Sequence, residues 1–181
     1  MTAECLELHP LNPQKRLLDR IAKRLKDGAV IVYPTDSCYA LGCHLGDKDA
    51  AERIRAIRKF DRHHLFTLMC RNLSDVGSYA RVDNSQFRLL KSMTPGPYTF
   101  VLKASGEAPK RLLHEKRKTI GLRIPDHTIT QAILATLGEP LLSCTLILPP
   151  ELLPVSDPVN VRPQLNGLVD LVVEAGDCGY E

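Results

Sequence analysis

The sequence predicts a single α/β domain with a twisted, mixed parallel and antiparallel sheet and flanking helices. Residues 29–33, AVIVY, form an apolar run rich in β-branched side chains, which is typical of a strand buried on both faces. Segments with helical spacing of apolar residues precede and follow this run, as in α/β folds. Some strand-like runs lie too close together for helical crossovers between them, so we expect the sheet to be mixed.

The elements follow from capping signals and from apolar periodicity. The predicted helices begin at Asn12-Pro13, at Asp47 or Asp49, at Asp83-Asn84 and at Asp126. The first, third and fourth end at Gly28, Thr94-Pro95 and Gly138, and the second carries Arg58 and Lys59 at its C-terminal end. The predicted strands are residues 29–33, 65–70, 98–103, 119–124, 140–148 and 168–176. Residues 149–163 are rich in proline and predict a surface connection with a short helix after it.

Composition bounds the class of protein. The 181 residues suit one domain, which buries about 70% of the surface of its unfolded chain and needs no disulfide or structural metal. The apolar runs fall short of the ~18 residues of a membrane span, and the N-terminus lacks the pattern of a signal peptide. The six cysteines are scattered without a C-x-x-C pair, which favours reduced thiols and a cytoplasmic protein with no membrane partner. The spacing of Cys38, Cys43 and His44 matches no zinc pattern, so we expect no metal site.

A net charge of +3 and a pI near 8.5 do not indicate a particular class of binding partner. Three local clusters are therefore the candidates for a functional site. The first is Thr35, Asp36 and Ser37, which directly follow the buried strand at residues 29–33. Such side chains either bond their own backbone in a turn or line a ligand site at the strand's carboxyl end.

The second cluster, residues 58–64, includes Arg58, Lys59, Arg62 and His63. It predicts either a solvated loop or a phosphate grip, because arginine and lysine bind phosphate oxygens well. Neither of the two common glycine-rich phosphate loops occurs in the sequence.

The third cluster is a basic strip before and within a predicted strand. Arg123 lies inside an apolar run, where an arginine needs a partner or an anionic ligand. The strip itself is either an exposed face or a surface that follows an RNA backbone. Its members are Lys110, Arg111, Lys116, Arg117 and Lys118.

Four stretches, in this order, resemble the YrdC-like family: VIVYPTDSCYALG, TPGPYTFVLK, TIGLRIPDH and EPLLS. The stretches HPLNPQKRLL, FTLMCR, VDN and LLHEKRKTIG are similar to its YciO branch. The resemblance covers residues 9–181 and implies a twisted α/β sheet around a basic concave cavity, without the family's usual last strand. It also implies synthesis of threonylcarbamoyl-AMP from ATP with Mg²⁺, L-threonine and bicarbonate, for threonylcarbamoyladenosine modification of tRNA.

Residue by residue, the family's Tyr-Pro-Thr-Asp-Thr, Pro-Gly-Pro-x-Thr and Gly-x-Arg-x-Pro motifs match residues 33–37, 95–99 and 121–125. The binding residues expected from the clusters and the resemblance are Thr35, Asp36, Ser37, Tyr39, Arg58, Lys59, Arg62, His63, Thr99, Arg123, Ser143 and Thr145. No catalytic residue is assigned.

Two departures separate this chain from the family's synthases. Phe60 stands at the arginine of their Lys-x-Arg motif, and Ile147 stands at the asparagine of their Ser-x-Asn motif. Losing two hydrogen bonds to charged groups weakens binding or rate by about 10²- to 10⁴-fold. The leading hypothesis is therefore a diverged synthase-like protein that binds ATP. The alternatives are a non-catalytic protein that binds double-stranded RNA or tRNA, and a hydrolase of threonylcarbamoyl-AMP or a related carbamoyl-adenylate.

Overall fold

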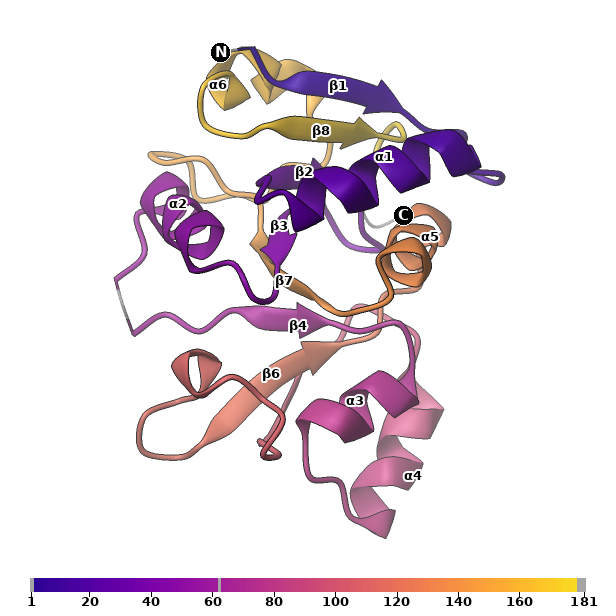
Figure 1. The fold of residues 1–181 in the computed structure, drawn as a ribbon, viewed down its shortest axis with the longest axis vertical. Helices are drawn as coiled ribbons and strands as arrows, with labels where there is room; N and C mark the ends of the chain where they lie inside the picture. Colours follow the sequence, from indigo (N-terminus) through magenta and orange to yellow (C-terminus); the bar gives the residue numbers. More distant parts are fainter. Residues whose placement is uncertain (1, 62, 179–181) are drawn as a thin grey trace.

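The computed structural model describes residues 2–61 and 63–178. Within these ranges, eight strands form one sheet in the order β1-β8-β2-β3-β7-β4-β6-β5 (Figure 1). The strands are β1 (Glu4–Glu7), β2 (Ile31–Tyr33), β3 (Ala40–His44), β4 (Thr67–Met69), β5 (Phe100–Lys103), β6 (Thr119–Arg123), β7 (Leu141–Thr145) and β8 (Leu171–Glu174). Parallel pairs (β1–β8, β2–β8, β4–β6) and antiparallel pairs (β2–β3, β3–β7, β4–β7, β5–β6) both occur, so the predicted mixed sheet is confirmed.

The helices are α1 (Lys15–Lys26), α2 (Lys48–Arg58), α3 (Leu73–Tyr79), α4 (Asn84–Met93), α5 (Thr128–Leu137) and α6 (Arg162–Leu165). Short 3-10 turns lie at Lys110–Leu112 and Val159–Val161. Each predicted strand is present with shorter bounds, whereas β1, β3 and α3 were not predicted. Three predicted capping signals are confirmed, since Asp47 caps α2, Asp83 and Gln86 form a capping box on α4, and Gly138 ends α5 at φ 79°.

Two predicted helix starts are wrong. The N-cap of α1 is Gln14 rather than Asn12, because the backbone N–H of Asn12 donates to His9 Nδ1 in a turn that precedes the helix. The N-cap of α5 is His127 rather than Asp126, because the N–H of Asp126 donates to a carboxylate oxygen of Asp36, 2.9 Å away. The second difference ties α5 to the first candidate cluster.

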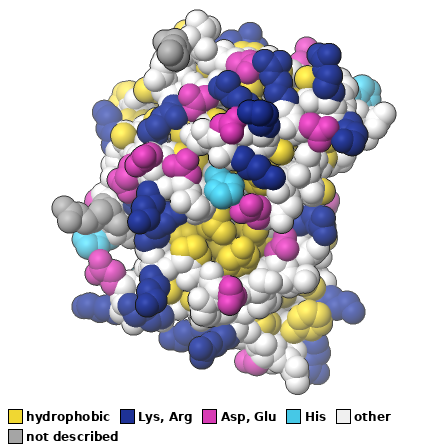
Figure 2. All heavy atoms as spheres, in the orientation of Figure 1, with side chains coloured by type: hydrophobic (Ala, Val, Ile, Leu, Met, Phe, Trp, Pro, Cys, Tyr) yellow, Lys and Arg dark blue, Asp and Glu magenta, His cyan; other side chains and the backbone are white. Residues whose placement is uncertain are grey.

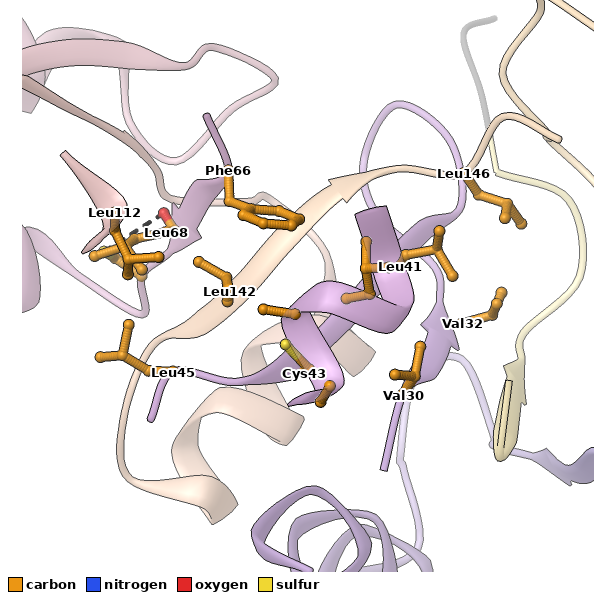
Figure 3. Packing of buried hydrophobic residues seen from close by; sticks show 14 of the residues in the cluster. Val30, Val32, Leu41, Cys43, Leu45, Phe66, Leu68, Leu112, Leu142 and Leu146 are labelled. Carbon is orange, nitrogen blue, oxygen red and sulfur yellow. Dashed lines mark hydrogen bonds between the residues drawn. The ribbon is translucent and has the colours of Figure 1, made fainter. Parts of the chain in front are cut away.

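Two hydrophobic cores lie on the two faces of the sheet. Successive strand residues alternate between them, so that Val32 and Leu41 belong to one core and Tyr33 and Ala40 to the other. The first core packs against α2, α3 and α4, and the second packs against α1 and α5. Figure 3 shows part of the first core, where side chains of β2, β3, β4 and β7 pack together. Burial on both faces explains why β2 reads as an unbroken apolar run.

The second face is covered unevenly. The α1 and α5 helices cover its β8 and β2 side, where Ile31 and Leu171 are fully buried. Toward β6 and β5 the face opens, since Gly121 is half-buried and Val101 is 67% exposed. We refer to this uncovered part, formed by alternate residues of β4, β6 and β5, as the open face. The exposure of Gly121 and Val101 makes this part of the sheet accessible from solvent.

Candidate functional site

The loop at residues 34–38 is both a hydrogen-bonded turn and part of a site. The hydroxyl of the buried Thr35 donates to the Cys38 carbonyl (2.6 Å) and accepts from the N–H groups of Ser37 (3.2 Å) and Cys38 (3.3 Å). Thr35 therefore shapes the turn, as expected of a threonine after a strand. This arrangement leaves the side chains of Asp36 and Ser37 to reach beyond the loop.

Arg123, the last residue of β6, is the partner of this loop. Its Nη2 donates to Asp36 Oδ1 and to Ser37 Oγ (3.0 Å), although three strands separate β2 from β6 in the sheet. The side chains of Arg123 and Asp36 are only 12% and 10% exposed. Arg123 Nε is also buried and has no hydrogen-bond acceptor among the described residues. The expected partner for the in-strand arginine is thus Asp36. Two of its five N–H donors are used in these bonds, and the others have no acceptor among the described residues and remain for an anionic group.

Helix α5 holds the other side of the loop. The buried Thr130 hydroxyl donates to the Pro34 carbonyl, and the N–H of Asp126 donates to Asp36 Oδ2 (2.9 Å). Asp36 therefore accepts from two segments at once, which fixes both of its oxygens. A carboxylate held in this way orients Arg123 before any ligand arrives.

Small and hydroxyl-bearing side chains line the open face beside Arg123. Thr67 of β4 pairs with Gly121 of β6, and Gly121 pairs with Val101 of β5. A side chain at Gly121 would contact the methyl group of Thr99 at 3.4 Å and the hydroxyl of Thr67 at 3.6 Å. The structure thus brings the predicted Thr99 next to Thr67, which the sequence interpretation missed. The signal was present in the period-2 alternation of strand 65–70, which places Thr67 on the face of the buried Met69.

Tyr33 lies at the buried end of this group of small and hydroxyl-bearing side chains. Its hydroxyl donates to Ser143 Oγ (2.6 Å), and Ser143 donates to the Leu41 carbonyl (3.1 Å). Burial raises the pKa of Tyr33 far above its ordinary value, with the Ser143 hydrogen bond opposing in part. Gly42 is required here, because a Cβ at this position would lie 2.7 Å from the Tyr33 ring.

Three other expected binding residues, Ser143, Tyr39 and Thr145, are buried or half-buried. Ser143 is buried and bonded as described. Tyr39 is fully buried, and its hydroxyl donates to the Gly176 carbonyl (2.7 Å) while accepting from the N–H of Ala175 (3.1 Å). Thr145 is half-buried at the end of β7.

Arg58, the last residue of α2, reaches the segment that follows β7. Its Nη1 donates to the Ile147 carbonyl (2.9 Å), and its Nε is buried without an acceptor among the described residues. Burial raises the pKa of the nearby Cys144 thiol to about 12, although Arg58 acts in the opposite direction. Cys144 is therefore a neutral neighbour of the guanidinium and not a thiolate nucleophile.

Lys59 and His63 of the second cluster have exposed positions. Lys59 ends α2 in the left-handed conformation at φ 53°, and its side chain is exposed. Lys59 and His63 line a surface hollow of about 370 Å³ together with Phe60, Asp61 and His64, and His63 lies 3.8 Å from the exposed Glu115. Arg62 lies outside the described residues. Of this cluster, the described contacts bring Arg58 alone to the end of β7.

The basic strip divides in two. Arg111 bonds within the protein, because its guanidinium donates to the Leu45 carbonyl. Lys110 is exposed and begins the same short turn. The members at residues 116–118 line a hollow of about 820 Å³ together with Arg81 and Lys103. The sequence interpretation missed Arg81 and Lys103, because the isolated bridge between Ala80 and Ala104 brings them next to the basic strip only in the folded chain.

The His127 cap predicts a pH dependence of stability. Its Nδ1 accepts from the N–H of Thr130 (3.4 Å), which requires an unprotonated nitrogen. Burial lowers the pKa of His127, against the opposing effects of Asp36 and Asp126. Because the pKa of His127 is lower in the folded state, the stability that the cap contributes is complete above the unfolded pKa of ~6.5 and is lost as the pH falls below that value.

Urea unfolding of His127→Asn, which caps at any pH, should show a smaller loss of stability between pH 7 and pH 5 than the wild type. An identical loss in both would contradict the assignment.

Two further properties concern the described ranges as a whole. No group of three or more His, Cys, Asp or Glu side chains in residues 2–61 and 63–178 is arranged to hold a metal ion. The helices in the same ranges are all too short or too polar to cross a membrane.

Comparison with known sequences identifies relatives of this chain. The model of the Sua5/YciO/YrdC family, described as telomere recombination, matches residues 23–181. The YciO protein of Escherichia coli K12 is 52% identical over 174 residues, which are 96% of this chain and 84% of the relative. A threonylcarbamoyl-AMP synthase of Chromobacterium violaceum is 35% identical over 135 residues, or 74% of this chain and 69% of the relative.

Solved structures agree with these relationships. The crystal structure of E. coli YciO matches with a TM-score of 0.93 at 50% identity, over 98% of this chain and 86% of that chain. The structure of Pyrococcus abyssi Sua5 complexed with L-threonine matches with a TM-score of 0.86, over 96% of this chain and 51% of that chain. Its identity is 18%, so it shows a shared fold alone. The resemblance inferred from the motifs is confirmed, and the chain belongs to the Sua5/YciO/YrdC family.

Proposed function

We propose that the protein binds L-threonine against the open face beside Arg123 and an adenine nucleotide beside Arg58, and that it carries out threonylcarbamoyl-adenylate chemistry. The observation that carries this proposal is Arg123, a nearly buried guanidinium fixed by Asp36 and Ser37 with its Nε unpaired. An arginine held in this way beside small, hydroxyl-bearing side chains suits the carboxylate of an amino acid. The second guanidinium, Arg58, suits a phosphate group of the nucleotide.

The proposed reaction joins L-threonine, bicarbonate and ATP into threonylcarbamoyl-AMP and releases pyrophosphate and water. Magnesium enters with ATP as part of the substrate. Such a reaction depends on positioning and on stabilising charge at the α-phosphate, and it needs no protein nucleophile. The relationship to a threonylcarbamoyl-AMP synthase at 35% identity supports this chemistry, as does the L-threonine bound to the structurally similar Sua5. The product would serve threonylcarbamoyladenosine modification of tRNA, and the free cysteines fit a cytoplasmic setting.

We expect the activity to be weaker than that of the synthases. Phe60 and Ile147 supply no side-chain hydrogen bond where the synthases carry Arg and Asn, which reduces binding or rate by about 10²- to 10⁴-fold. Calorimetry with ATP and magnesium, with and without L-threonine and bicarbonate, tests the proposal. Saturable heat that grows when threonine is present is expected. The absence of binding heat in every combination would contradict the proposed function.

A product assay then separates synthesis from hydrolysis. The wild type is incubated with ATP, L-threonine and bicarbonate in one arm and with preformed threonylcarbamoyl-AMP in the other. Formation of the adenylate in the first arm supports synthesis. Its loss in the second arm, with no formation in the first, supports the hydrolase.

A second candidate function, binding of double-stranded RNA or tRNA, is favoured by the basic hollow. Three residues of the basic strip and Arg81 and Lys103 surround its volume of about 820 Å³. Figure 2 shows Lys and Arg side chains along the lower part of the molecule, on the side where Figure 1 draws β6. The hollow has no aromatic lining, which disfavours base stacking and favours contact with the phosphates of a duplex.

Charge reversal at Lys116 tests RNA binding. The wild-type affinity for a short RNA duplex should fall steeply between low and physiological salt, because each neutralised phosphate releases counterions. Lys116→Glu should weaken binding and reduce the slope of log affinity against log salt by about 1 or more. Lys26→Glu, at an exposed position at the end of α1, is the matched control with the same change in net charge. An affinity that does not respond to salt, or equal effects of both variants, would exclude this function.

A further inference from the structure

An aromatic stack lies beside Arg58. The rings of Phe60 and His64 are stacked with their centroids 3.4 Å apart and their planes 18° apart. The guanidinium carbon of Arg58 lies 4.4 Å from the centroid of the Phe60 ring. Phe60 therefore contacts the cation of Arg58 and also stacks on His64. We refer to Arg58, Phe60 and His64 as the stack.

Several backbone contacts keep the stack in place. The N–H of Phe60 donates to the Arg55 carbonyl (3.0 Å), and Arg55 Nη1 donates to the carbonyls of His64 (2.8 Å) and Asp61 (3.2 Å). Asp61 Oδ1 in turn accepts from the N–H of His64 (3.0 Å). Arg55 is itself held against the ring of the buried Phe66, 4.7 Å from its centroid. The two rings are thus anchored to the core through Arg55.

The stack fixes the plane of the Arg58 guanidinium. One of its five N–H donors bonds to the Ile147 carbonyl (2.9 Å), and the Phe60 ring restricts rotation about the side-chain torsions. The buried Nε has no acceptor among the described residues. Arg58 therefore enters a binding event already oriented, with donors that are not used by the protein.

The charge state of the stack is simple at neutral pH. Burial lowers the pKa of His64, and the neighbouring cations Arg58 and Arg55 lower it further, against the smaller opposing effect of Asp61. His64 is therefore uncharged near pH 7, and the stack carries the single positive charge of Arg58. His64 therefore adds no second cation that would compete with Arg58 for an anion.

We propose that Phe60 and His64 are positioning residues that hold Arg58 ready to receive a phosphate group of the nucleotide. The inference rests on the proposed function, and it gives Phe60 a role of its own in place of a lost charge. Pre-orientation of one guanidinium offsets part of the affinity that a second cation would supply.

Phe60→Ala tests the proposal through two ligands. Cation–π contacts of this kind affect binding modestly, so the affinity for AMP should fall about 3- to 30-fold in calorimetry. The affinity for L-threonine, which the proposal places at Arg123, should be unchanged and reports on correct folding. Phe60→Tyr keeps the ring and should bind AMP as the wild type does. Phe87→Ala removes a 46% exposed phenylalanine from α4 and serves as the matched control.

A measurement without ligand separates this inference from the proposed function. The Nε proton of Arg58 should give a slowly exchanging NMR signal shifted by the Phe60 ring current, which Arg58→Lys identifies by its disappearance. Phe60→Ala should remove the shift and speed the exchange, whereas Phe60→Tyr should keep both. An unchanged Arg58 signal in Phe60→Ala, or equal changes in AMP and threonine affinity, overturns the positioning role. If the wild type binds no adenine nucleotide, the proposed function fails while the Arg58 signal still decides the role of Phe60.

Discussion

Replacing Arg123 by alanine is expected to lower the free energy of unfolding by about 3–5 kcal/mol and to abolish binding of L-threonine. The change leaves the Asp36 carboxylate, which is 10% exposed, without its counterion. An uncompensated buried charge of this kind costs far more than the pair itself contributes. Urea unfolding measures the first effect and calorimetry the second.

The control for this prediction is Arg16→Ala, which removes an exposed arginine from α1 and should change stability by less than about 0.5 kcal/mol. A second variant isolates the cause of the loss. Asp36→Asn combined with Arg123→Met removes both charges and should recover part of the stability lost in Arg123→Ala. If Arg123→Ala unfolds like the control, the ion pair does not organise the loop at residues 34–38.

Replacing Ile147 by asparagine is expected to raise the affinity for ATP about 10- to 100-fold. The half-buried Ile147 follows β7, where its carbonyl accepts from Arg58, so an amide side chain would lie close to the proposed phosphate position. One added hydrogen bond to a charged phosphate is worth about 1.5–3 kcal/mol. The stack is untouched by this change, so Arg58 keeps its orientation.

Ile147→Leu is the matched control, because it changes the side chain without adding a donor or an acceptor. Calorimetry with ATP and magnesium on both variants measures the difference. If Ile147→Asn binds ATP no better than Ile147→Leu, the phosphates do not lie at the end of β7.

The fold was predictable wherever local patterns were strong. The run at residues 29–33 and the caps at Asp47 and Asp83 are complete signals within a few residues. The elements that escaped prediction have weak local signals. β1 is a four-residue strand at the edge of the sheet, β3 contains Gly42, and α3 spans seven residues with Gly77 inside. Long-range sheet pairing and packing stabilise these elements, and a local pattern does not record them.

The candidate site was predictable only in part for a similar reason. Thr35 and Arg123 each stand out locally, yet the ion pair that joins the loop to β6 depends on how the whole sheet is assembled. The sequence interpretation identified Phe60 as a lost charge but did not predict its contact with Arg58. That contact depends on the left-handed conformation of Lys59, which turns the chain back at the end of α2.

A crystal structure with L-threonine and AMP bound would show directly which guanidinium holds each ligand. The threonine carboxylate should lie within hydrogen-bonding distance of Arg123 on the open face, and the AMP phosphate should lie within hydrogen-bonding distance of Arg58. Threonine away from Arg123, or the phosphate in the hollow lined by Arg81 and Lys116 instead, would contradict it.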